Sequence, residues 1–220
     1  MVAVLRKLRN GRASLLSSFR YGHSLLFDPR KFEMLIAIAA ISPLLLLSAP
    51  RWHGEIRNAI QTAGLVLIVV CIIGRTWCAL WIAGRKVREL VDTGPYSVSR
   101  NPLYLFSIVG AVGAGAQLGS LSAAILGGAA VARILFRRVL VEEQRMLTWH
   151  GEVYQSYMAK VPRFWPRLAS WHGGGFQVRK TRAVIMTFLD GCFFLTAIPI
   201  AGLLHYLHQH NFIPTLLLLP

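Results

Sequence analysis

The chain has 220 residues, of which 55% are hydrophobic, and it carries a formal net charge of +15. Soluble domains rarely combine so apolar a composition with so high a charge, whereas membrane proteins with several helices often do. The basic residues flank apolar stretches and do not alternate with aromatic residues on one surface. This pattern argues against a nucleic-acid-binding protein and favours contact with anionic lipid headgroups.

Five apolar blocks follow one another along the chain, each close to the roughly 20 residues that a helix needs to cross the hydrocarbon of a bilayer. We therefore expect an all-α, polytopic membrane bundle of about five transmembrane helices. The blocks cover residues 33–49, 58–83, 102–119, 121–141 and 183–207. Only a short polar break separates the third block from the fourth, so these two are expected to form a helical hairpin with small residues at its interface.

The fourth helix is expected to extend beyond the membrane. The residues after Arg133 keep a helical spacing of apolar and charged side chains, and we expect this helix to end near Gly151. The next segment, Pro162-Arg-Phe-Trp-Pro-Arg167, combines aromatic and basic residues in a way that is typical of a membrane interface. Gly173-Gly-Gly175 then predicts a flexible linker before the last helix.

The distribution of charge predicts which side of the membrane each loop faces. Lys and Arg are retained on the cytosolic side, and 21 of the 24 basic residues fall in segments that five helices place on the same side. These segments are residues 1–32, 84–101 and 133–182. We therefore expect the N-terminus and the polar segments in the cytosol and the C-terminus on the opposite side.

These patterns divide the chain into four parts. A basic cytosolic N-terminal arm (1–32) precedes transmembrane helices 1 and 2 (33–83). A core that contains the hairpin (84–170) follows, and a linker leads to the C-terminal transmembrane helix (171–220). No metal site is expected, because the three cysteines lie inside expected helices at spacings that do not suit metal ligands. They are Cys71, Cys78 and Cys192.

A polar segment, Gly94-Pro-Tyr-Ser-Val-Ser-Arg-Asn-Pro-Leu-Tyr104, lies between two apolar blocks. Gly94 and Pro95 predict a turn, and Pro102 suits the first turn of the next helix. Unpaired backbone N–H groups at such a helix start can bind a carboxylate or a ribose. Arg100 has two interpretations: it contacts an anionic substrate, or it anchors the helix to lipid headgroups.

Charged residues recur where the fourth helix leaves the membrane. Arg138 and Glu142 are four residues apart and therefore share one face of the helix, which we expect to meet the polar segment. Because unpaired charges at this depth are costly, Arg138 either orients a substrate or reaches the headgroups and pairs with Glu142. Glu143 lies about 100° further round the helix and is a candidate catalytic base.

Two further charged residues lie inside expected helices, where such residues often serve function. Arg75, near the middle of the second block, is a candidate for binding the anionic headgroup of a substrate. Asp190 lies in the last block and carries no recognisable motif. For Asp190, a partner such as Arg75 or a depth near the cytosol is an equally good explanation.

Five motifs occur in a fixed order between about residues 85 and 166. They are Leu90-Val-x-x-Gly-x-Tyr96, Arg100-Asn-Pro-Leu-Tyr104, Arg138-x-x-x-Glu-Glu-x-x-Leu147, Gly151-x-x-Tyr154-x-x-Tyr157 and Val161-Pro-Arg-Phe-Trp-Pro166. Each motif alone is weak, but their order and spacing resemble the isoprenylcysteine carboxyl methyltransferase family, to which the phospholipid methyltransferases are related.

The resemblance implies an S-adenosyl-L-methionine pocket on the cytosolic side, covered by protein and open sideways to lipid. By position, ten residues match the cofactor contacts of the family: Arg88, Glu89, Leu90, Val91, Tyr96, Asn101, Pro102, Leu103, Tyr104 and Glu142. Arg138 matches its substrate-contacting arginine. Arg88 and Asn101 stand where the family often has His, and Asn101 retains the capacity to donate and accept hydrogen bonds.

A methyltransferase of this kind aligns an acceptor with a sulfonium-bound methyl group and excludes water. We expect the acceptor to be a membrane-embedded amphiphile, either an isoprenylcysteine-like carboxylate or a lipid. The predicted substrate-binding residues are Arg138, Arg100 and Arg75. Arg138 would orient a carboxylate, and Glu143 would serve as the base for an amine or a phenol.

Two other functions stay open on the sequence alone. A membrane reductase of the sterol type has a cofactor-binding end of similar build but takes NADPH, whose 2′-phosphate favours more clustered Arg and Lys than this chain has. A membrane scaffold would keep the fold without the chemistry. The sequence favours neither a monomer nor an oligomer, since small residues serve packing within one chain as readily as between chains.

Overall fold

A computed structural model of the chain describes residues 47–85, 89–174 and 180–220. All of these belong to one unit, Leu44–Pro220. The expected N-terminal arm, almost all of the first expected helix and the predicted cofactor contact Arg88 lie outside the described residues.

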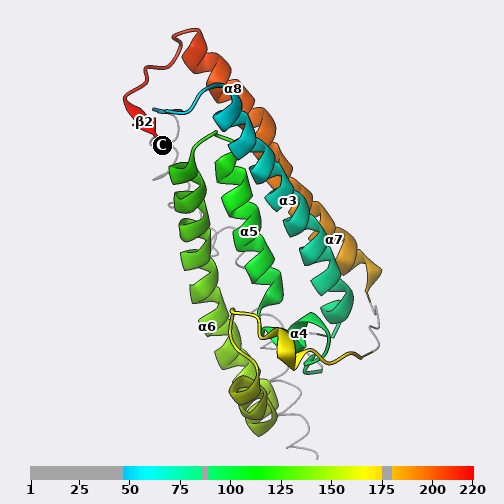
Figure 1. The fold of residues 1–220 in the computed structure, drawn as a ribbon. Coiled ribbons are helices and arrows are strands. Elements are labelled where there is room, and N and C mark those ends of the chain that lie inside the picture. Colours follow the sequence, from blue (N-terminus) through cyan, green and yellow to red (C-terminus); the bar gives the residue numbers. More distant parts are fainter. Residues whose placement is uncertain (1–46, 86–88, 175–179) are drawn as a thin grey trace, which may run out of the picture. The chain divides into compact units, whose positions relative to one another are not determined.

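Three helices lie side by side in the centre of the described structure (Figure 1). They are α3 (Gly54–Ile82), α5 (Pro102–Ala116) and α6 (Leu121–Lys160). α5 packs against both α3 and α6, which confirms the expected hairpin of α5 and α6. The hairpin needs a residue without a side chain at its interface, because a Cβ at Gly115 would lie 2.4 Å from the carbonyl oxygen of Ala123.

α6 extends further than the sequence predicted. The expected helix end at Gly151 is a kink, where this glycine has φ +53° and ψ −128°, and a second helical segment continues to Lys160. Two tyrosines of this segment, Tyr154 and Tyr157, are buried and pack with Leu90 and other apolar side chains. Burial of these rings stabilises the additional turns, which local sequence alone does not predict.

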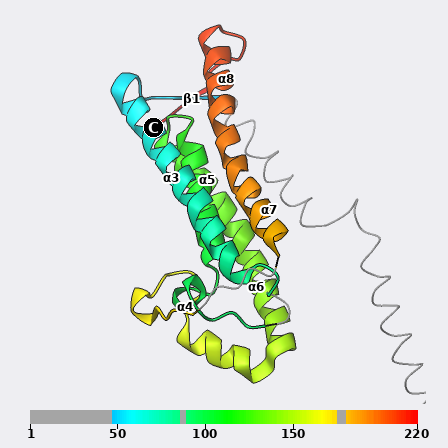
Figure 2. The same ribbon diagram turned by 90° about the vertical axis from the view of Figure 1, so that its right-hand side faces the viewer.

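The last expected helix, residues 183–207, consists of two helices and a short 3₁₀ turn. α7 (Thr181–Cys192) and α8 (Ala197–Gln209) flank η2 (Phe193–Thr196). α7 packs along α3, and Figure 2 shows α7 and α8 following one another along one side of the bundle. Pro199 lies in the first turn of α8, directly after η2, where its missing N–H cannot continue the helical hydrogen bonds.

Short elements mark the two ends of the bundle. α4 (Pro95–Val98) and η1 (Leu168–Ser170) lie at one end, called here the α4 end. At the opposite end, β1 (Ser48–Pro50) pairs in parallel with β2 (Leu217–Leu219). This pair departs from the expected all-α fold, because strands of three residues are too short to show a periodic pattern.

The outer surface of the helices is rich in apolar side chains. Two helical stretches, Gly54–Ile82 and Thr181–Gln209, are long and apolar enough to cross a membrane, while α5 is shorter. Outward-facing residues such as Ile73 and Ile125 are 65% and 68% exposed. Extended apolar surface of this kind marks contact with lipid or with a partner. These features support a helical membrane protein, and the number of five transmembrane helices stays a prediction.

Candidate functional site

A cavity of about 340 Å³ lies near the α4 end, with walls from α3, α5, α6 and α7. It brings together eight of the ten residues predicted to contact the cofactor, namely Glu89, Leu90, Val91, Tyr96, Asn101, Leu103, Tyr104 and Glu142. Pro102 instead occupies the first position of α5, where a proline suits a helix start. Arg100 and Glu143 add a cation and a second carboxylate to the lining.

A sharp turn at Gly94 positions the residues that follow it. Gly94 has φ +61° and ψ −132°, a conformation that side-chain-bearing residues rarely adopt. A Cβ at this position would also lie 2.5 Å from the ring of Trp81. The hydroxyl of the buried Ser97 donates to the Gly94 carbonyl oxygen at 2.6 Å. This turn holds α4 against α3 and places Tyr96 in the cavity wall.

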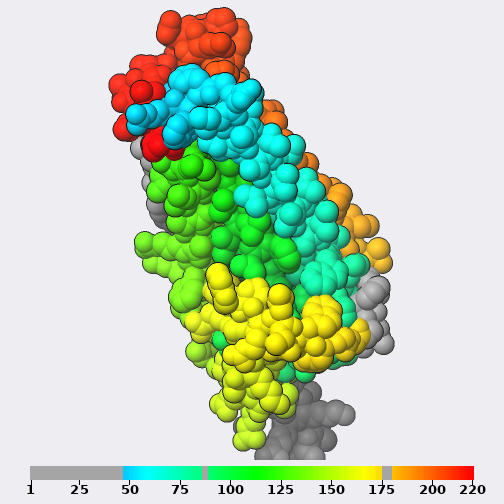
Figure 3. All heavy atoms as spheres, viewed as in Figure 1, coloured from blue at the N-terminus to red at the C-terminus, as the bar shows by residue number. Residues whose placement is uncertain are grey.

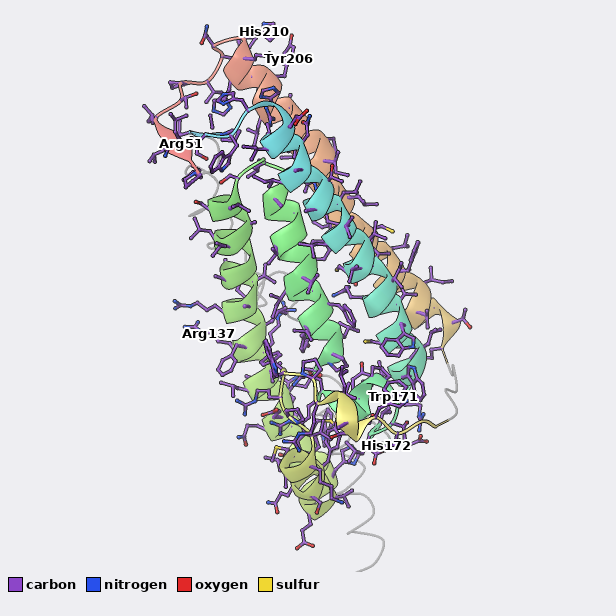
Figure 4. The ribbon with its side chains drawn as sticks, viewed as in Figure 1. Arg51, Arg137, Trp171, His172, Tyr206 and His210 are labelled. Carbon is purple, nitrogen blue, oxygen red and sulfur yellow. The ribbon has the colours of Figure 1, made fainter. Side chains whose placement is uncertain are left out.

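Residues 161–172, called here the strap, lie across the polar segment at the α4 end (Figure 3). Three main-chain hydrogen bonds join the two. The N–H of Arg100 donates to the carbonyl of Pro162 at 2.9 Å, that of Arg167 to the carbonyl of Val98 at 3.0 Å, and that of Gly94 to the carbonyl of His172 at 3.0 Å. Figure 4 shows Trp171 and His172 beside α4, and Trp171 stacks on Trp77 of α3. The strap therefore fixes the polar segment against the ends of the helices.

Asn101 takes part in this attachment. Its Nδ2 donates to the main-chain carbonyl of Arg163 at 3.2 Å, and its backbone N–H donates to the Ser99 hydroxyl at 3.3 Å. The Ser99 hydroxyl in turn donates to the carbonyl of Phe164 at 3.1 Å. Asn101 thus links the cavity wall to the strap.

Tyr104 and Glu142 meet in the cavity from two helices. The Tyr104 hydroxyl on α5 donates to Oε2 of Glu142 on α6 at 3.0 Å. The expected contact between the polar segment and this face of the fourth helix is therefore present. The pair offers a carboxylate that is held in a fixed orientation.

Glu143 lies between two arginines and is only 5% exposed. Its Oε2 is 2.8 Å from Nη2 of Arg163, and its Oε1 is 3.4 Å from Nη2 of Arg100. The hydrogen bonds to Glu143 raise the pKa of the Arg163 guanidinium. The Nε of Arg100 is buried and has no hydrogen-bond partner among the described residues. A buried donor without a partner is costly, so this atom is well suited to a ligand that accepts its hydrogen.

Two of the three predicted substrate-binding arginines do not line the cavity. Arg138 is exposed on α6, one turn before Glu142, and its neighbour Arg137 points away from the bundle in Figure 4. Arg75 donates to the hydroxyl of Ser107 on α5. Asp190 is exposed on α7, and in the part of the chain that the structure describes it forms no ion pair with Arg75.

The cysteines contribute nothing to the cavity lining. Cys71 and Cys78 are buried in α3, and Cys192 at the end of α7 is half-buried. Within residues 47–85, 89–174 and 180–220, no group of three or more His, Cys, Asp or Glu side chains is placed to hold a metal ion.

Several lining residues were not predicted from the sequence. They are Ala79, Ile82, Ala83, Gly84, Met146, Tyr154, Tyr157, Ala183 and Thr187. Tyr154 and Tyr157 belong to one of the five motifs, so their spacing was a usable signal. Burial raises the pKa of Tyr154 to about 12, and this hydroxyl stays protonated at neutral pH. The small residues of α3 and α7 gave no signal, because they resemble those of any packed helix.

Comparison with known proteins identifies the family to which the chain belongs. The phospholipid methyltransferase family model matches residues 62–153. The chain is also 30% identical over 186 residues to the nickel-cobalt-cadmium resistance protein NccN of Alcaligenes xylosoxydans xylosoxydans, a match that covers 84% of this chain and 87% of NccN. The chain belongs to the phospholipid methyltransferase family. The cobalt-zinc-cadmium resistance protein CzcN of Cupriavidus metallidurans is 33% identical over 139 residues, 63% of this chain and 64% of CzcN. No solved structure matches the chain.

Membership of the phospholipid methyltransferase family confirms the resemblance that the motifs indicate and supports a membrane methyltransferase. The matched residues run from α3 to the kink of α6 and include α4, α5 and the Glu142–Glu143 pair. The strap and α7 lie outside the matched residues. Both nevertheless shape the site, since the strap holds Arg100 and α7 forms part of the cavity wall.

Proposed function

We propose that the protein is an integral membrane methyltransferase that uses S-adenosyl-L-methionine to methylate a membrane-embedded amphiphile. The two-sided lining of the cavity carries this proposal. The charged groups are Glu89, Arg100 and two carboxylates of α6, whereas the lining residues of α3 and α7 carry no charge. A charged cofactor and an acceptor with a hydrocarbon chain can meet in such a space. Family membership supports methyl transfer as the reaction.

The cavity residues suit the charges of S-adenosyl-L-methionine. That molecule carries a carboxylate, an ammonium and a sulfonium group. Arg100, with its buried and unpartnered Nε, would hold the carboxylate through charge-assisted hydrogen bonds. Glu142, oriented by Tyr104, would attract the positive charge. The lining holds one arginine, Arg100, and three carboxylates, Glu89, Glu142 and Glu143, and so offers both signs of charge to a ligand that carries both.

The contribution of the chain to methyl transfer is alignment and exclusion of water. When bound, the cofactor supplies an electrophilic methyl group. Tyr157 donates to the carbonyl oxygen of Tyr96 at 2.7 Å and so joins the kinked end of α6 to α4. This contact fixes two lining residues against each other, and we expect the acceptor to enter from the apolar side.

The predicted substrate contacts keep distinct roles in this proposal. Arg138, exposed one turn before Glu142, would contact the polar headgroup of the acceptor at the membrane surface. Arg75 is already bonded to Ser107 and lies outside the lining, so it would act only on a group that reaches deeper into the bundle. For Glu143, the ion pairs with both arginines favour positioning of Arg100 over proton transfer.

Titration of the purified protein in detergent with S-adenosylmethionine, S-adenosylhomocysteine and NADPH tests the cofactor. Binding of the first two is expected. Glu142→Gln should weaken it about tenfold or more, because hydrogen bonds to charged groups contribute roughly 1.5–3 kcal/mol. Glu152→Gln removes the same charge at an exposed position outside the cavity and should bind like the wild type. Binding of NADPH alone would favour the reductase, and binding of none of them the scaffold.

The names of both relatives favour a physiological setting for this reaction. NccN and CzcN are named for resistance to nickel, cobalt, zinc or cadmium. We propose that methylation by the present chain contributes to metal tolerance. Cells that lack the gene should grow less well in nickel, cobalt or cadmium, and the wild-type gene should restore growth. Equal rescue by the Glu142→Gln variant would contradict a role of the methyl transfer itself.

A further inference from the structure

The apolar side of the cavity is built by two helices that pack on each other. The end of α3 supplies Ala79, Ile82 and Ala83, and α7 supplies Ala183 and Thr187. None of these five side chains is ionisable. The groups that carry charge in the lining are Glu89, which follows α3, Arg100 of the polar segment, and Glu142 and Glu143 of α6. An apolar wall lowers the free energy of an apolar ligand group and raises that of a charged one, so the two sides select different parts of the bound molecules.

Ala183 and Thr187 have features that suit a wall for a hydrocarbon chain. They are four residues apart and therefore share one face of α7. Both are small, and the Thr187 hydroxyl donates to the Ala183 carbonyl at 2.9 Å, so its hydrogen is already used within the helix. The larger residues of α7, such as Ile185 and Met186, are 50% and 47% exposed and do not line the cavity. The face of α7 that lines the cavity thus carries small side chains, which leave space for a ligand, while larger side chains lie on its outer face.

We propose that Ala183 and Thr187 form the wall that receives the hydrocarbon chain of the methyl acceptor and set the width available to it. This inference rests on the proposed function and assigns the two ligands to opposite sides of one cavity. The acceptor chain lies against α3 and α7, and the cofactor lies against Arg100 and Glu142. Because α7 lies outside residues 62–153, the two residues proposed to set this width lie outside the part of the chain that matches the family model.

A photocrosslinking experiment tests the wall without knowledge of the natural acceptor. The purified protein in lipid nanodiscs is saturated with S-adenosylhomocysteine and exposed to either of two probes that carry a diazirine in the hydrocarbon chain. One is an N-acetyl-S-farnesylcysteine analogue, and the other is a phosphatidylethanolamine. Adducts are mapped by mass spectrometry at Ala79 and Ala83, which are 2% and 4% exposed and therefore report the cavity and not general contact with the bilayer.

Labelling of Ala79 or Ala83 by at least one probe is expected in the wild type. Thr187→Phe should reduce it about fivefold or more, because filling the wall forces the chain out or strains the packing. Thr187→Leu should give a smaller decrease and serves if the phenylalanine variant folds poorly. Met186→Phe adds the same ring to the outer face of α7 and should label like the wild type. The probe that labels distinguishes a prenyl chain from an acyl chain.

Affinity for S-adenosylhomocysteine, measured on the same proteins, separates this inference from the proposed function. It should stay within about twofold of the wild type in both Thr187 variants, since the cofactor side is unchanged. Three results would contradict the proposed role of Ala183 and Thr187. They are absent labelling, labelling that Thr187→Leu and Thr187→Phe do not change, and loss of S-adenosylhomocysteine affinity in well-folded Thr187 variants. Failure of the wild type to bind S-adenosylhomocysteine would refute the proposed cofactor, while the labelling pattern would still report where a hydrocarbon chain lies.

Discussion

Glu143 joins two distant parts of the chain through one carboxylate. Arg100 comes from the polar segment and Arg163 from the strap, and both contact it. Taking such a group out of water is costly, and its two partners offset that cost only while it remains charged. Both oxygens of this carboxylate already lie beside an arginine nitrogen. Its effect on the reaction is therefore expected to pass through the position of Arg100.

Glu143→Gln is expected to lower the free energy of unfolding by about 3–5 kcal/mol, because it leaves two arginines without their counter-charge. Denaturation in detergent measures this loss, and titration with S-adenosylhomocysteine should show a lower affinity. Glu152→Gln, at an exposed position, should change neither quantity. A variant that keeps its stability and its cofactor affinity but loses turnover would instead identify Glu143 as a catalytic base.

The residues on the polar side of the cavity were predicted chiefly through the resemblance carried by the ordered motifs, and local constraints add to this only in the polar segment. Gly94 and Pro102 delimit a short segment, and a turn followed by a helix start leaves few directions for the side chains between them. Arg163 belongs to a motif, yet its pairing with Glu143 bridges 20 residues and depends on how the strap folds back. Ala183 and Thr187 are distant in sequence from the motifs, and nothing local distinguishes them from packing residues.

At the scale of elements, α4 depends on a glycine for which the chain provides a matched control. Gly94 and Gly151 have nearly the same backbone angles, φ +61°, ψ −132° and φ +53°, ψ −128°. Alanine therefore imposes a similar conformational cost at both, about 1–3 kcal/mol. Only the surroundings differ, because a Cβ at Gly151 would have nothing within 4 Å, whereas at Gly94 it would meet the ring of Trp81.

Gly94→Ala is expected to destabilise the protein more than Gly151→Ala, since it must also displace Trp81 or α4. It should also weaken S-adenosylhomocysteine binding, because α4 carries Tyr96 into the cavity wall. Thermal unfolding and titration in detergent measure the two effects. Equal losses of stability with unchanged affinity in both variants would show that the position of α4 does not matter to the site.

The helices were predicted better than their ends. Apolar length placed the described parts of α3, α5 and the start of α6 close to their observed bounds. The continuation of α6 beyond Gly151 was missed, because a glycine signals a helix end only when the following turn has nothing to bury. Here Tyr154 and Tyr157 are buried in the cavity wall. Tertiary contacts thus decided what local sequence left ambiguous.

At the scale of the whole molecule, the proposed orientation depends on an unequal distribution of charge. Arg51 and Arg57 lie toward the end that carries β1 and β2, while the strap and the polar segment at the α4 end carry Arg100, Arg163 and Arg167. Because basic residues are retained in the cytosol, we propose that the α4 end and the site face the cytosol.

Cysteine labelling in intact cells measures this orientation. Asn211 follows α8, Ala169 lies in η1 at the α4 end, and both are exposed. A membrane-impermeant maleimide should label an Asn211→Cys variant directly and an Ala169→Cys variant only after the membrane is permeabilised. The wild type, whose Cys71 and Cys78 are buried, provides the background. The reverse pattern would place the site on the outer side.

The way in which the strap is attached also bears on which changes of sequence it can tolerate. The contacts between Arg100 and Pro162, between Arg167 and Val98 and between Gly94 and His172 use backbone atoms on both sides. Backbone groups are the same in almost every residue, so substitutions at the exposed positions Trp165 and Leu168 leave these bonds intact. Chains that differ at such exposed strap positions can therefore keep the same attachment, and divergence at these positions is poor evidence of lost activity.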